Sequence, residues 1–377
     1  MSKLKSVFKF AGNIPGFHTS KKLIVFTSDD WGGVRLLSIG AKKALSEAGF
    51  DIAGNRFDRY DTLESNTDIE HLFDVLLKHR DSVGNYPVIA AVANVANPDF
   101  EKIKNNHFSE YYYETFDKTL NRYPDHEKVL TLYRKGIELN IFRPEFHGRE
   151  HLHTNRWLCE LQSGNKMVSK AFEYEFFHIG GKYLNNHAAE RGLGAAYDID
   201  NVNDVLDQMK IVKDGADIFK NIFGYSSVYF TPPAQYYHKS LEESMVDAGF
   251  KMIDVPGLRK MPLGSNRYAT RFHYLGQKNR DNGLRYLTRN AVFEPNMSEN
   301  SDGVQACLKS IEAAFKYNRP AIISNHRAAF VGGIDIANRD KGLKSLDLLL
   351  SEIIKRWPDV EFISAASLYE LMINKSC

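Results

Sequence analysis

Residues 23–33 read Leu-Ile-Val-Phe-Thr-Ser-Asp-Asp-Trp-Gly-Gly. Four apolar residues in a row, bounded by polar ones, are typical of a strand that is buried on both faces. The two acids follow this run at once, so we expect Asp29 and Asp30 where the strand ends and a loop begins. Strand ends of this kind are where α/β barrels keep their catalytic residues. The stretch therefore predicts a sheet that is buried on both faces, with the catalytic residues at the carboxyl ends of its strands.

Two histidines lie four residues apart in the run 146–151, Phe-His-Gly-Arg-Glu-His. We expect a helical turn here, which would place the imidazoles of His147 and His151 on one side, where a single divalent ion can bind both. Asp30 would close the site as a third ligand. Zinc is the expected ion, although cobalt, nickel or iron accept the same donors. Three protein ligands leave one position open, as in catalytic metal sites.

Strand-like and helix-like stretches alternate along the rest of the chain. The expected strands include 87–92, 140–146, 227–230, 251–255, 320–324 and 360–364, and the expected helices include 34–48, 69–78, 128–138, 204–222, 239–248, 303–316, 341–356 and 365–373. A hairpin added to the scaffold is expected between Tyr268 and Phe293. Repeated strand-then-helix order predicts a parallel sheet covered by helices, and polar residues just after several strands favour a barrel.

No linker or low-complexity segment divides the chain. We therefore expect an N-terminal extension over residues 1–20 and a single α/β domain over residues 21–377, built as a distorted (β/α) barrel. Insertions into this barrel are expected near residues 105–125, 155–200 and 265–295.

The composition is that of an ordinary globular chain. Of 377 residues, 43% are hydrophobic and 25% charged, and the formal net charge of +2 gives no broad electrostatic footprint for nucleic acid. Cys159, Cys307 and Cys377 show no paired spacing, which fits a reducing compartment. Residues 1–17 contain no apolar run of signal-peptide length, and no stretch is long enough to span a bilayer. We expect a cytoplasmic protein, and the oligomeric state stays open.

Taken in order, these motifs resemble those of the polysaccharide deacetylases. Residues 27–30, Thr-Ser-Asp-Asp, followed by Gly32, are similar to the family's first motif, in which the first Asp acts as base and the second binds the metal. Residues 147–151 resemble the second motif, which supplies two His ligands. Residues 322–326, Ile-Ile-Ser-Asn-His, resemble the last motif, whose histidine, here His326, serves as acid. The resemblance spans residues 22 to 373.

The resemblance implies a metal-dependent hydrolase with a distorted (β/α) barrel. This enzyme would remove an acyl group from a carbohydrate, and N-acetyl is the acyl group expected first. Asp29 would take a proton from the attacking water, and His326 would give one to the leaving nitrogen or oxygen. If the protein is cytoplasmic, an acylated sugar, a nucleotide sugar or a lipid-linked glycan intermediate is the accessible substrate.

Three positions depart from the family pattern. Residues 230–233, Phe-Thr-Pro-Pro, occupy the place of the third motif but lack the Arg that orients the catalytic Asp, and Arg149 and Arg327 are the expected replacements. Gly148 stands where the family has Ser or Thr. Trp31 is an extra residue, which would form a wall of a sugar cleft or pack inward. The expected substrate-binding residues are Trp31, Arg149, Pro233 and Arg327.

Two alternatives remain open at this point. A metal-free glycoside hydrolase on a related barrel would pair Asp29 with Glu145 or Glu150, because paired carboxylates cleave glycosides without an ion. A non-catalytic glycan-handling protein would keep the fold and lose the chemistry.

Overall fold

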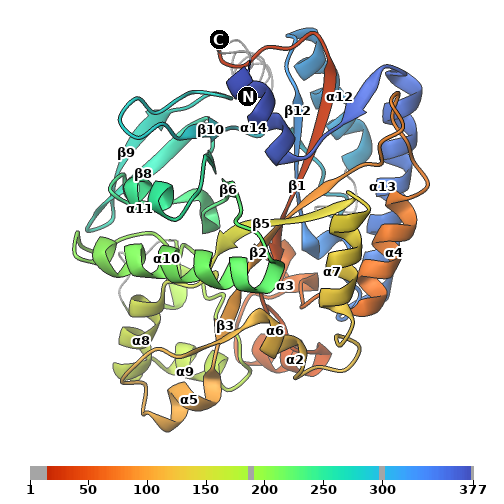
Figure 1. Ribbon diagram of the computed structural model, residues 1–377. Helices are drawn as coiled ribbons and strands as arrows, with labels where there is room; N and C mark the ends of the chain where they lie inside the picture. The colour runs from red at the N-terminus through yellow and green to blue at the C-terminus, as the bar shows by residue number, and fades with distance from the viewer. Residues whose placement is uncertain (1–14, 186–190, 297–301, 375–377) are drawn as a thin grey trace.

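The computed structural model describes residues 15–185, 191–296 and 302–374. Its centre is a nine-stranded sheet in which neighbouring strands run parallel (Figure 1). The strands follow the order β10-β7-β6-β5-β2-β1-β12-β11, and β13 pairs with the start of β1. Their bounds are β1 Lys22–Trp31, β2 Ile89–Asn94, β5 Phe142–Gly148, β6 Tyr229–Phe230, β7 Met252–Asp254, β10 Arg285–Leu287, β11 Ala291–Val292, β12 Ala321–His326 and β13 Val360–Phe362.

The two ends of this strand order are one stretch of chain. β10 and β11 are separated only by residues 288–290, so the same extended backbone pairs first with β7 and then with β12. We call residues 285–294 the crossing segment. It joins the first strand of the order to the last and closes the sheet into an irregular barrel. The predicted distorted (β/α) barrel is therefore confirmed.

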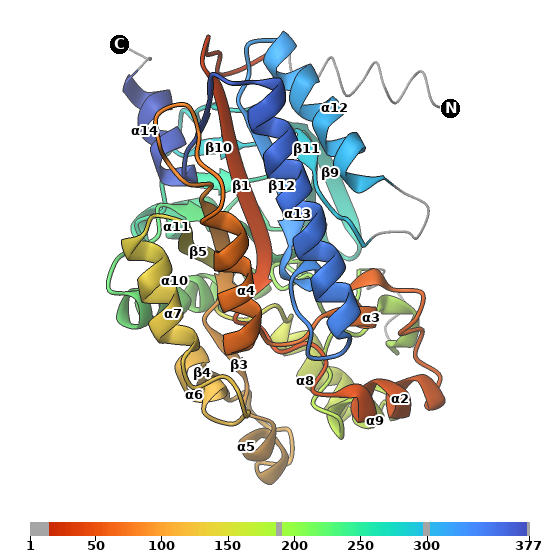
Figure 2. The same ribbon diagram turned by 90° about the vertical axis from the view of Figure 1, so that its right-hand side faces the viewer.

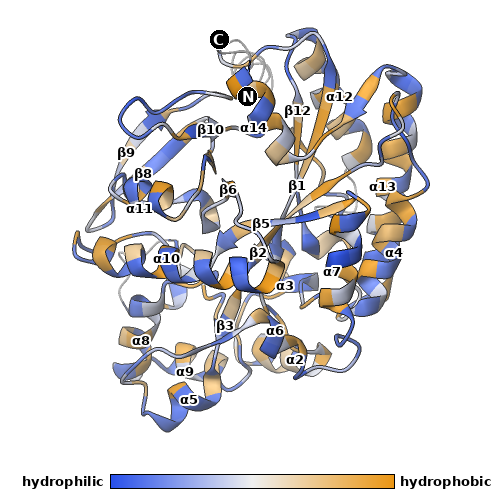
Figure 3. Cartoon of the chain, in the orientation of Figure 1, coloured by the Kyte–Doolittle hydropathy of each residue, from blue (hydrophilic) through white to orange (hydrophobic). Residues whose placement is uncertain are grey.

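Helices cover the outside of the barrel. Figure 2 shows α4 and α13 running alongside β1, one on each side of it. The covering helices are α4 Asn66–Leu76, α7 Val129–Glu138, α10 Asp204–Phe223, α11 Leu241–Asp247, α12 Gly303–Lys316 and α13 Ile336–Arg356, whereas α14 Ala365–Asn374 packs on the cluster inside the barrel. Their apolar faces pack on the sheet and their polar faces carry the hydrophilic colours of Figure 3.

Side chains of β1 alternate between two hydrophobic clusters, as the period of a strand requires. Ile24 and Phe26 join the large cluster beneath the outer helices. Val25 belongs instead to the cluster inside the barrel, where it packs with Ile322 of β12 and Leu368 of α14. The interior is therefore a packed core, and any substrate must bind beyond the ends of the strands.

A group of short helices lies beyond the carboxyl ends of the strands, at the bottom of Figures 1 and 2. We call α2 Ile39–Glu47, α5 Phe100–Asn105, α8 Thr154–Gln162 and α9 Lys166–Phe172 the cap. They have a hydrophobic cluster of their own, which includes Phe50, Phe100, Trp157 and Phe172. Two further short helices, α3 Arg56–Tyr60 and α6 Phe116–Leu120, and a two-stranded pair, β3 Ala96–Pro98 with β4 Tyr113–Thr115, connect this region to the barrel.

The hairpin expected between Tyr268 and Phe293 is found only as a short antiparallel contact, in which Lys278 bridges Arg285. The longer hairpin is β8 Leu258–Gly264 with β9 Arg267–Phe272, which begins earlier in the chain. The stretch from Arg285 onward also pairs in parallel within the barrel. Its short apolar runs resemble hairpin strands locally, and only the distant partners β7 and β12 decide the difference. Among the described residues, no helix combines the length and the apolar character needed to cross a membrane.

Candidate metal centre

The end of β1 turns two adjacent acids toward the same cavity. In a regular strand Asp29 and Asp30 would point to opposite faces. Here the pairing with β2 shifts register between Ser28 and Trp31, and Asp30 adopts a left-handed φ of 74°. This bulge lets both carboxylates line one cavity of about 740 Å³ between the barrel and the cap. Backbone strain at this position, rare for a residue other than glycine, is what brings the two acids together.

A second irregularity places His147. Along the β2–β5 pairing, Ala93 faces Phe146 but Asn94 faces Gly148, so His147 is the extra residue of a bulge. Its Nδ1 lies 2.6 Å from the carbonyl oxygen of Thr231, and its Nε2 lies 3.2 Å from Oδ1 of Asp30. Because a carbonyl can only accept, Nδ1 carries a proton and donates it, and Nε2 is turned toward the carboxylate.

A loop, and not the expected helical turn, places His151 next to Asp30. Residues 147–151 form no helical turn, because β5 continues to Gly148 and a loop follows. Gly148 has a φ of 116°, and a Cβ there would lie 3.1 Å from the hydroxyl of Tyr197, which explains why glycine occupies this position. The loop brings Nε2 of His151 to 3.6 Å from Oδ1 of Asp30.

Asp30, His147 and His151 fit a divalent ion. Their donor atoms all lie within 4.8 Å of one another. Burial lowers the pKa of His151 to about 4, so its ring is neutral at pH 7, as a metal ligand must be. Burial alone would raise the pKa of Asp30, but the hydrogen bond with His147 and the neighbouring imidazoles hold it well below its usual value. The Thr231 carbonyl accepts the Nδ1 proton of His147, so a bound ion would take the place of the proton that Nε2 otherwise donates to Asp30, an arrangement typical of metal-binding histidines.

Arg289, in the crossing segment, holds the other acid. Its guanidinium donates to both oxygens of Asp29, over 2.5 and 2.7 Å. It also donates to Asp254 at the end of β7, to Ser324 and to Thr231, so all five of its N–H donors are used. Burial alone would raise the pKa of Asp29, but the ion pair with Arg289 lowers it. Asp29 is therefore ionised and fixed in orientation.

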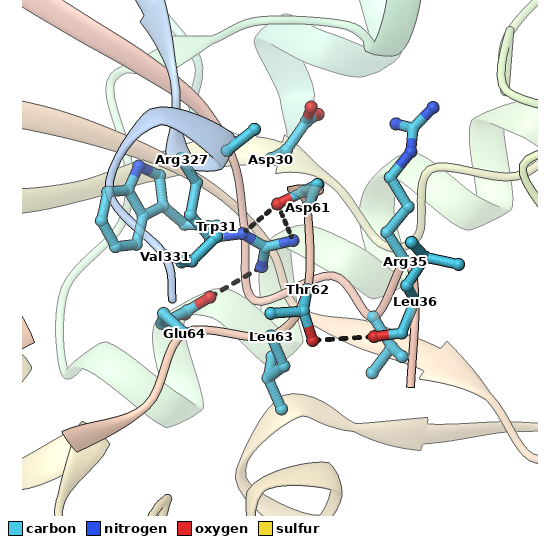
Figure 4. Close-up of polar contacts among 12 residues, drawn as sticks. Asp30, Trp31, Arg35, Leu36, Asp61, Thr62, Leu63, Glu64, Arg327 and Val331 are labelled. Atoms are coloured by element: carbon cyan, nitrogen blue, oxygen red, sulfur yellow. Dashed lines mark hydrogen bonds and ion pairs between the residues drawn. The ribbon is translucent and has the colours of Figure 1, made fainter. Parts of the chain in front are cut away.

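Arg327, an expected replacement for the absent third-motif Arg, points away from the cavity. Figure 4 shows its guanidinium turned toward Asp61 and Glu64, to which it donates over 3.0 and 2.7 Å. The side chain is 1% exposed and does not line the cavity. The expectation that Arg327 binds substrate is therefore wrong, because the nearest acids to this arginine lie on the chain that follows α3.

Arg149 and Pro233 are not in the cavity either. Arg149 pairs with Glu150 over 2.6 Å and with Asp214 of α10 over 2.9 Å, on the outer side of the β5 turn. Pro233 is buried, and only its neighbours Pro232 and Ala234 line the cavity. Both were expected to bind substrate, and both expectations are wrong, because each side chain follows a turn that carries it behind the cavity wall.

Trp31 packs inward. It is 1% exposed, meets the Phe142 ring edge-on at 4.9 Å, and donates from its indole N–H to the hydroxyl of Ser28 over 2.9 Å. The bulge that turns Asp30 into the cavity sends the next residue to the helix side of the sheet. The expectation that Trp31 binds substrate at a sugar cleft is wrong, and the inward alternative holds.

His326 ends β12 opposite Asp29, its partner in the β1–β12 register. Its Nδ1 makes a short hydrogen bond with Glu294 of the crossing segment, and its Nε2 lies 3.8 Å from Oδ2 of Asp29. Burial would lower the pKa of His326, but Glu294 outweighs it and raises the pKa to about 9. The ring is therefore protonated at pH 7 and can supply a proton inside the cavity.

Three lining or supporting residues escaped the sequence analysis. Arg289 and Glu294 orient Asp29 and His326, and His178 lines the cavity with its ring centroid 5.4 Å from that of His151. None carries a local signal, because each belongs to an irregular stretch whose partners are distant in sequence.

The second carboxylate that a metal-free glycosidase requires does not face Asp29. Glu145 is fully buried, with its oxygens on Ser227 and Arg143. Glu150 is bound by Arg149. Among the described residues neither glutamate lines the cavity, so Asp29 forms no pair with Glu145 or Glu150 of the kind that a metal-free glycosidase requires.

A second group of three donors, His153, Asp200 and Asp204, lies within ligand distance in the described chain. Nδ1 of His153 accepts a hydrogen bond from the Arg156 backbone at the start of α8, so its proton is on Nε2, which then has no lone pair for a metal. Asp200 is bound by the Arg156 guanidinium. His153 is thus a helix cap, and the cluster is an ion-pair network.

Of three comparisons with known proteins, the one with solved structures bears on the fold. No protein-family model matches the chain, and no curated protein matches it. A solved structure of a "putative glycoside hydrolase/deacetylase" from Parabacteroides distasonis aligns over 95% of this chain and 72% of that one, with a TM-score of 0.50 and 6% identity. A probable polysaccharide deacetylase from Pseudomonas aeruginosa PAO1 aligns over 93% and 91%, with a TM-score of 0.47 and 8% identity.

At these identities the comparison shows the fold alone. The chain has a barrel of the polysaccharide deacetylase type, as the motifs predicted. What the chain does has to be argued from its own site.

Proposed function

We propose that the protein is a metal-dependent hydrolase that removes an acyl group, in the first instance N-acetyl, from a carbohydrate. One observation carries this proposal: Asp30, His147 and His151 converge at the base of a cavity, with an ionised Asp29 and a protonated His326 beside them. A carboxylate and two imidazoles are a donor set that zinc, cobalt, nickel and iron accept.

A divalent ion held by these three residues would polarise an acyl carbonyl and make a nearby water more acidic. The protein's own groups do the rest. Asp29, kept ionised and oriented by Arg289, takes a proton from the attacking water. His326, kept protonated by Glu294, delivers a proton to the leaving sugar nitrogen as the carbon–nitrogen bond breaks. The two side chains start in the opposite protonation states that this sequence of transfers requires.

The turn after β6 contributes a backbone donor. Thr231 uses its N–H on the Phe146 carbonyl, and Pro232 and Pro233 have none. Ala234, which lines the cavity at a φ of 54°, is thus the first residue after Thr231 that has an N–H to offer to a developing oxyanion. A donor fixed in a strained turn needs no reorientation during the reaction.

The test is release of acetate from N-acetylglucosamine oligosaccharides and from N-acetylglucosamine itself by the full chain. We expect turnover that a chelator abolishes and that Zn²⁺ or Co²⁺ restores. Asp29→Asn should lower kcat by about 10²–10⁴, the range for loss of a general base, while the metal stays bound. Turnover that survives both the chelator and the Asp29→Asn change would refute the proposal.

A further inference from the structure

One cation in the cavity has no acid to balance it. The lining arginines and lysine other than Arg191 each have a carboxylate within 4 Å: Arg35 pairs with Asp58 at 2.7 Å, Lys182 with Asp51 at 3.8 Å and Arg289 with Asp29 at 2.5 Å. Within the described chain, Arg191 has no ion pair with an acid, and its Nε is buried without a hydrogen-bond partner. A guanidinium is always charged, and no acid among the described residues balances this one, so it is available to an anion that enters the cavity.

Arg191 is held in place by aromatic rings. Its guanidinium lies 3.4 Å from the ring centroid of Tyr236 and 4.6 Å from that of Tyr268, in the corner that the two rings form. The Tyr268 hydroxyl is anchored by a 3.0 Å hydrogen bond to Asp198. Stacking of this kind, together with a side-chain hydrogen bond to Tyr268, fixes the plane of the guanidinium and leaves its Nε without a partner.

Tyr236 is itself presented by a strained turn. The two residues before it, Ala234 and Gln235, both have left-handed φ values, 54° and 58°. Gln235 is tied down by a 3.0 Å hydrogen bond from its side-chain amide to Asp254, the acid that also binds Arg289. The turn that shapes the reacting end of the cavity therefore also positions the ring beneath Arg191.

Arg191 lies within reach of the reacting group. A Cβ on Gly194 would lie 3.4 Å from the His151 ring, and Arg191 is only three residues earlier. Three residues span at most about 11 Å, so a sugar bound at the candidate metal centre can place a substituent on this arginine.

We propose that Arg191 binds an anionic group of the substrate, a carboxylate or a phosphate, so that the protein acts on an acidic acylated sugar. The planar fork of a guanidinium matches either group with two parallel hydrogen bonds. The identity of the reacting acyl group rests on the proposed function, but the recognition of the anion does not.

The experiment compares three ligands by titration calorimetry: N-acetylglucosamine 1-phosphate, the methyl glycoside of N-acetylglucosaminuronic acid, and the uncharged methyl glycoside of N-acetylglucosamine. The wild-type chain should bind at least one acidic ligand about tenfold or more tightly than the uncharged one, as expected for a charge-assisted contact. The acidic ligand with the higher affinity shows whether the site binds a phosphate or a carboxylate.

Substitutions then locate the anion. Arg191→Gln should abolish the preference, and Arg191→Lys, which keeps the charge but loses the fork, should keep part of it. Lys182→Gln is the matched control, because that cation is already paired and should leave the preference intact. Equal binding of all three ligands by the wild-type chain would overturn the proposal. A preference for the acidic ligands that survives Arg191→Gln would also overturn it, because the anion would then bind elsewhere, for example at a metal ion.

Acetate release from the same compounds separates this inference from the proposed function. Turnover without any acidic preference would refute the anion site alone. An acidic preference that depends on Arg191, without turnover under any metal condition, would refute the proposed reaction alone.

Discussion

Two stretches of chain build opposite halves of the candidate site in different ways. β1 is a ten-residue strand that is regular up to the bulge at its end, and it places Asp29 and Asp30 in the cavity. The crossing segment has two short strands, of three and two residues, changes partner between them, and delivers Arg289 and Glu294. The groups proposed to react come from β1 and β12, and the groups that orient them come from the crossing segment.

The difference teaches where in this fold chemistry is visible in sequence. The apolar pattern of a long strand predicts where the strand ends, and the polar residues found there are candidates for function. A segment that closes a barrel between two distant strands has no regular apolar periodicity. The roles of its side chains can be recognised only from the residues that they contact in the folded structure. The following predictions test whether the two halves depend on each other as the geometry indicates.

The largest effect is expected from breaking the link between the halves. Arg289→Gln leaves Asp29 and Asp254 buried and unpaired, with side chains 9% and 0% exposed. We expect a loss of about 3–5 kcal/mol in the free energy of unfolding, the usual cost of removing one partner of a buried ion pair. Acetate release should also fall, because the pKa of Asp29 then rises. Denaturant unfolding and steady-state kinetics measure the two effects.

Arg149→Gln is the matched control. The Arg149 side chain is as buried as that of Arg289, 10% exposed in each, but its partners Glu150 and Asp214 lie behind the cavity. It should destabilise the fold by a similar amount while the folded fraction keeps its kcat. A comparable loss of kcat in both variants would show that Arg289 has only a structural role.

A smaller effect is expected on the pH profile. Glu294→Gln removes the group that raises the pKa of His326 to about 9, so the pKa should fall toward its ordinary 6.5 or below. The alkaline limb of kcat/KM should therefore move to lower pH. Because the folded pKa is raised, the ion pair contributes stability that is full below pH 6.5 and lost as the pH rises through about 9. An unmoved alkaline limb would remove His326 from the role of acid.

The smallest effect is expected on the helix side of β1. Trp31→Phe removes a buried hydrogen bond and part of the contact with Phe142, so we expect a loss of about 1–2 kcal/mol in stability. KM for an acylated sugar should stay the same, since Trp31 does not line the cavity. A rise in KM without a change in unfolding would return this residue to the substrate site.

Much of the fold could be predicted from the sequence, because its strands and helices carry clear apolar periodicity. Helix 303–316 has the predicted bounds, and the order of strands and helices led to the correct barrel. The extent of the hairpin was wrong, because beyond its short antiparallel contact at Arg285 the crossing segment pairs in parallel with distant strands. The turn after β5 was predicted as helical because a spacing of four fits a helix, whereas Gly148 makes the same approach possible from a loop.

The candidate site was predicted in part. The sequence placed Asp29, Asp30, His147 and His326 at strand ends and His151 four residues after His147, and the structure brings all five around one cavity. The arginine that holds Asp29 was sought at Arg149 and Arg327, near the motifs in sequence. It proved to be Arg289, because a barrel brings the ends of all its strands together whatever their separation along the chain.

The most direct test of the account is the metal content of the purified chain, measured by elemental analysis beside two variants. We predict about one equivalent of zinc or another divalent transition metal in the wild type, and none in His147→Ala/His151→Ala. His153→Ala, which removes a helix-capping histidine nearby, should keep the metal. Absence of metal in the wild type after incubation with Zn²⁺, Co²⁺, Ni²⁺ and Fe²⁺, or full retention by the double variant, would contradict the candidate metal centre.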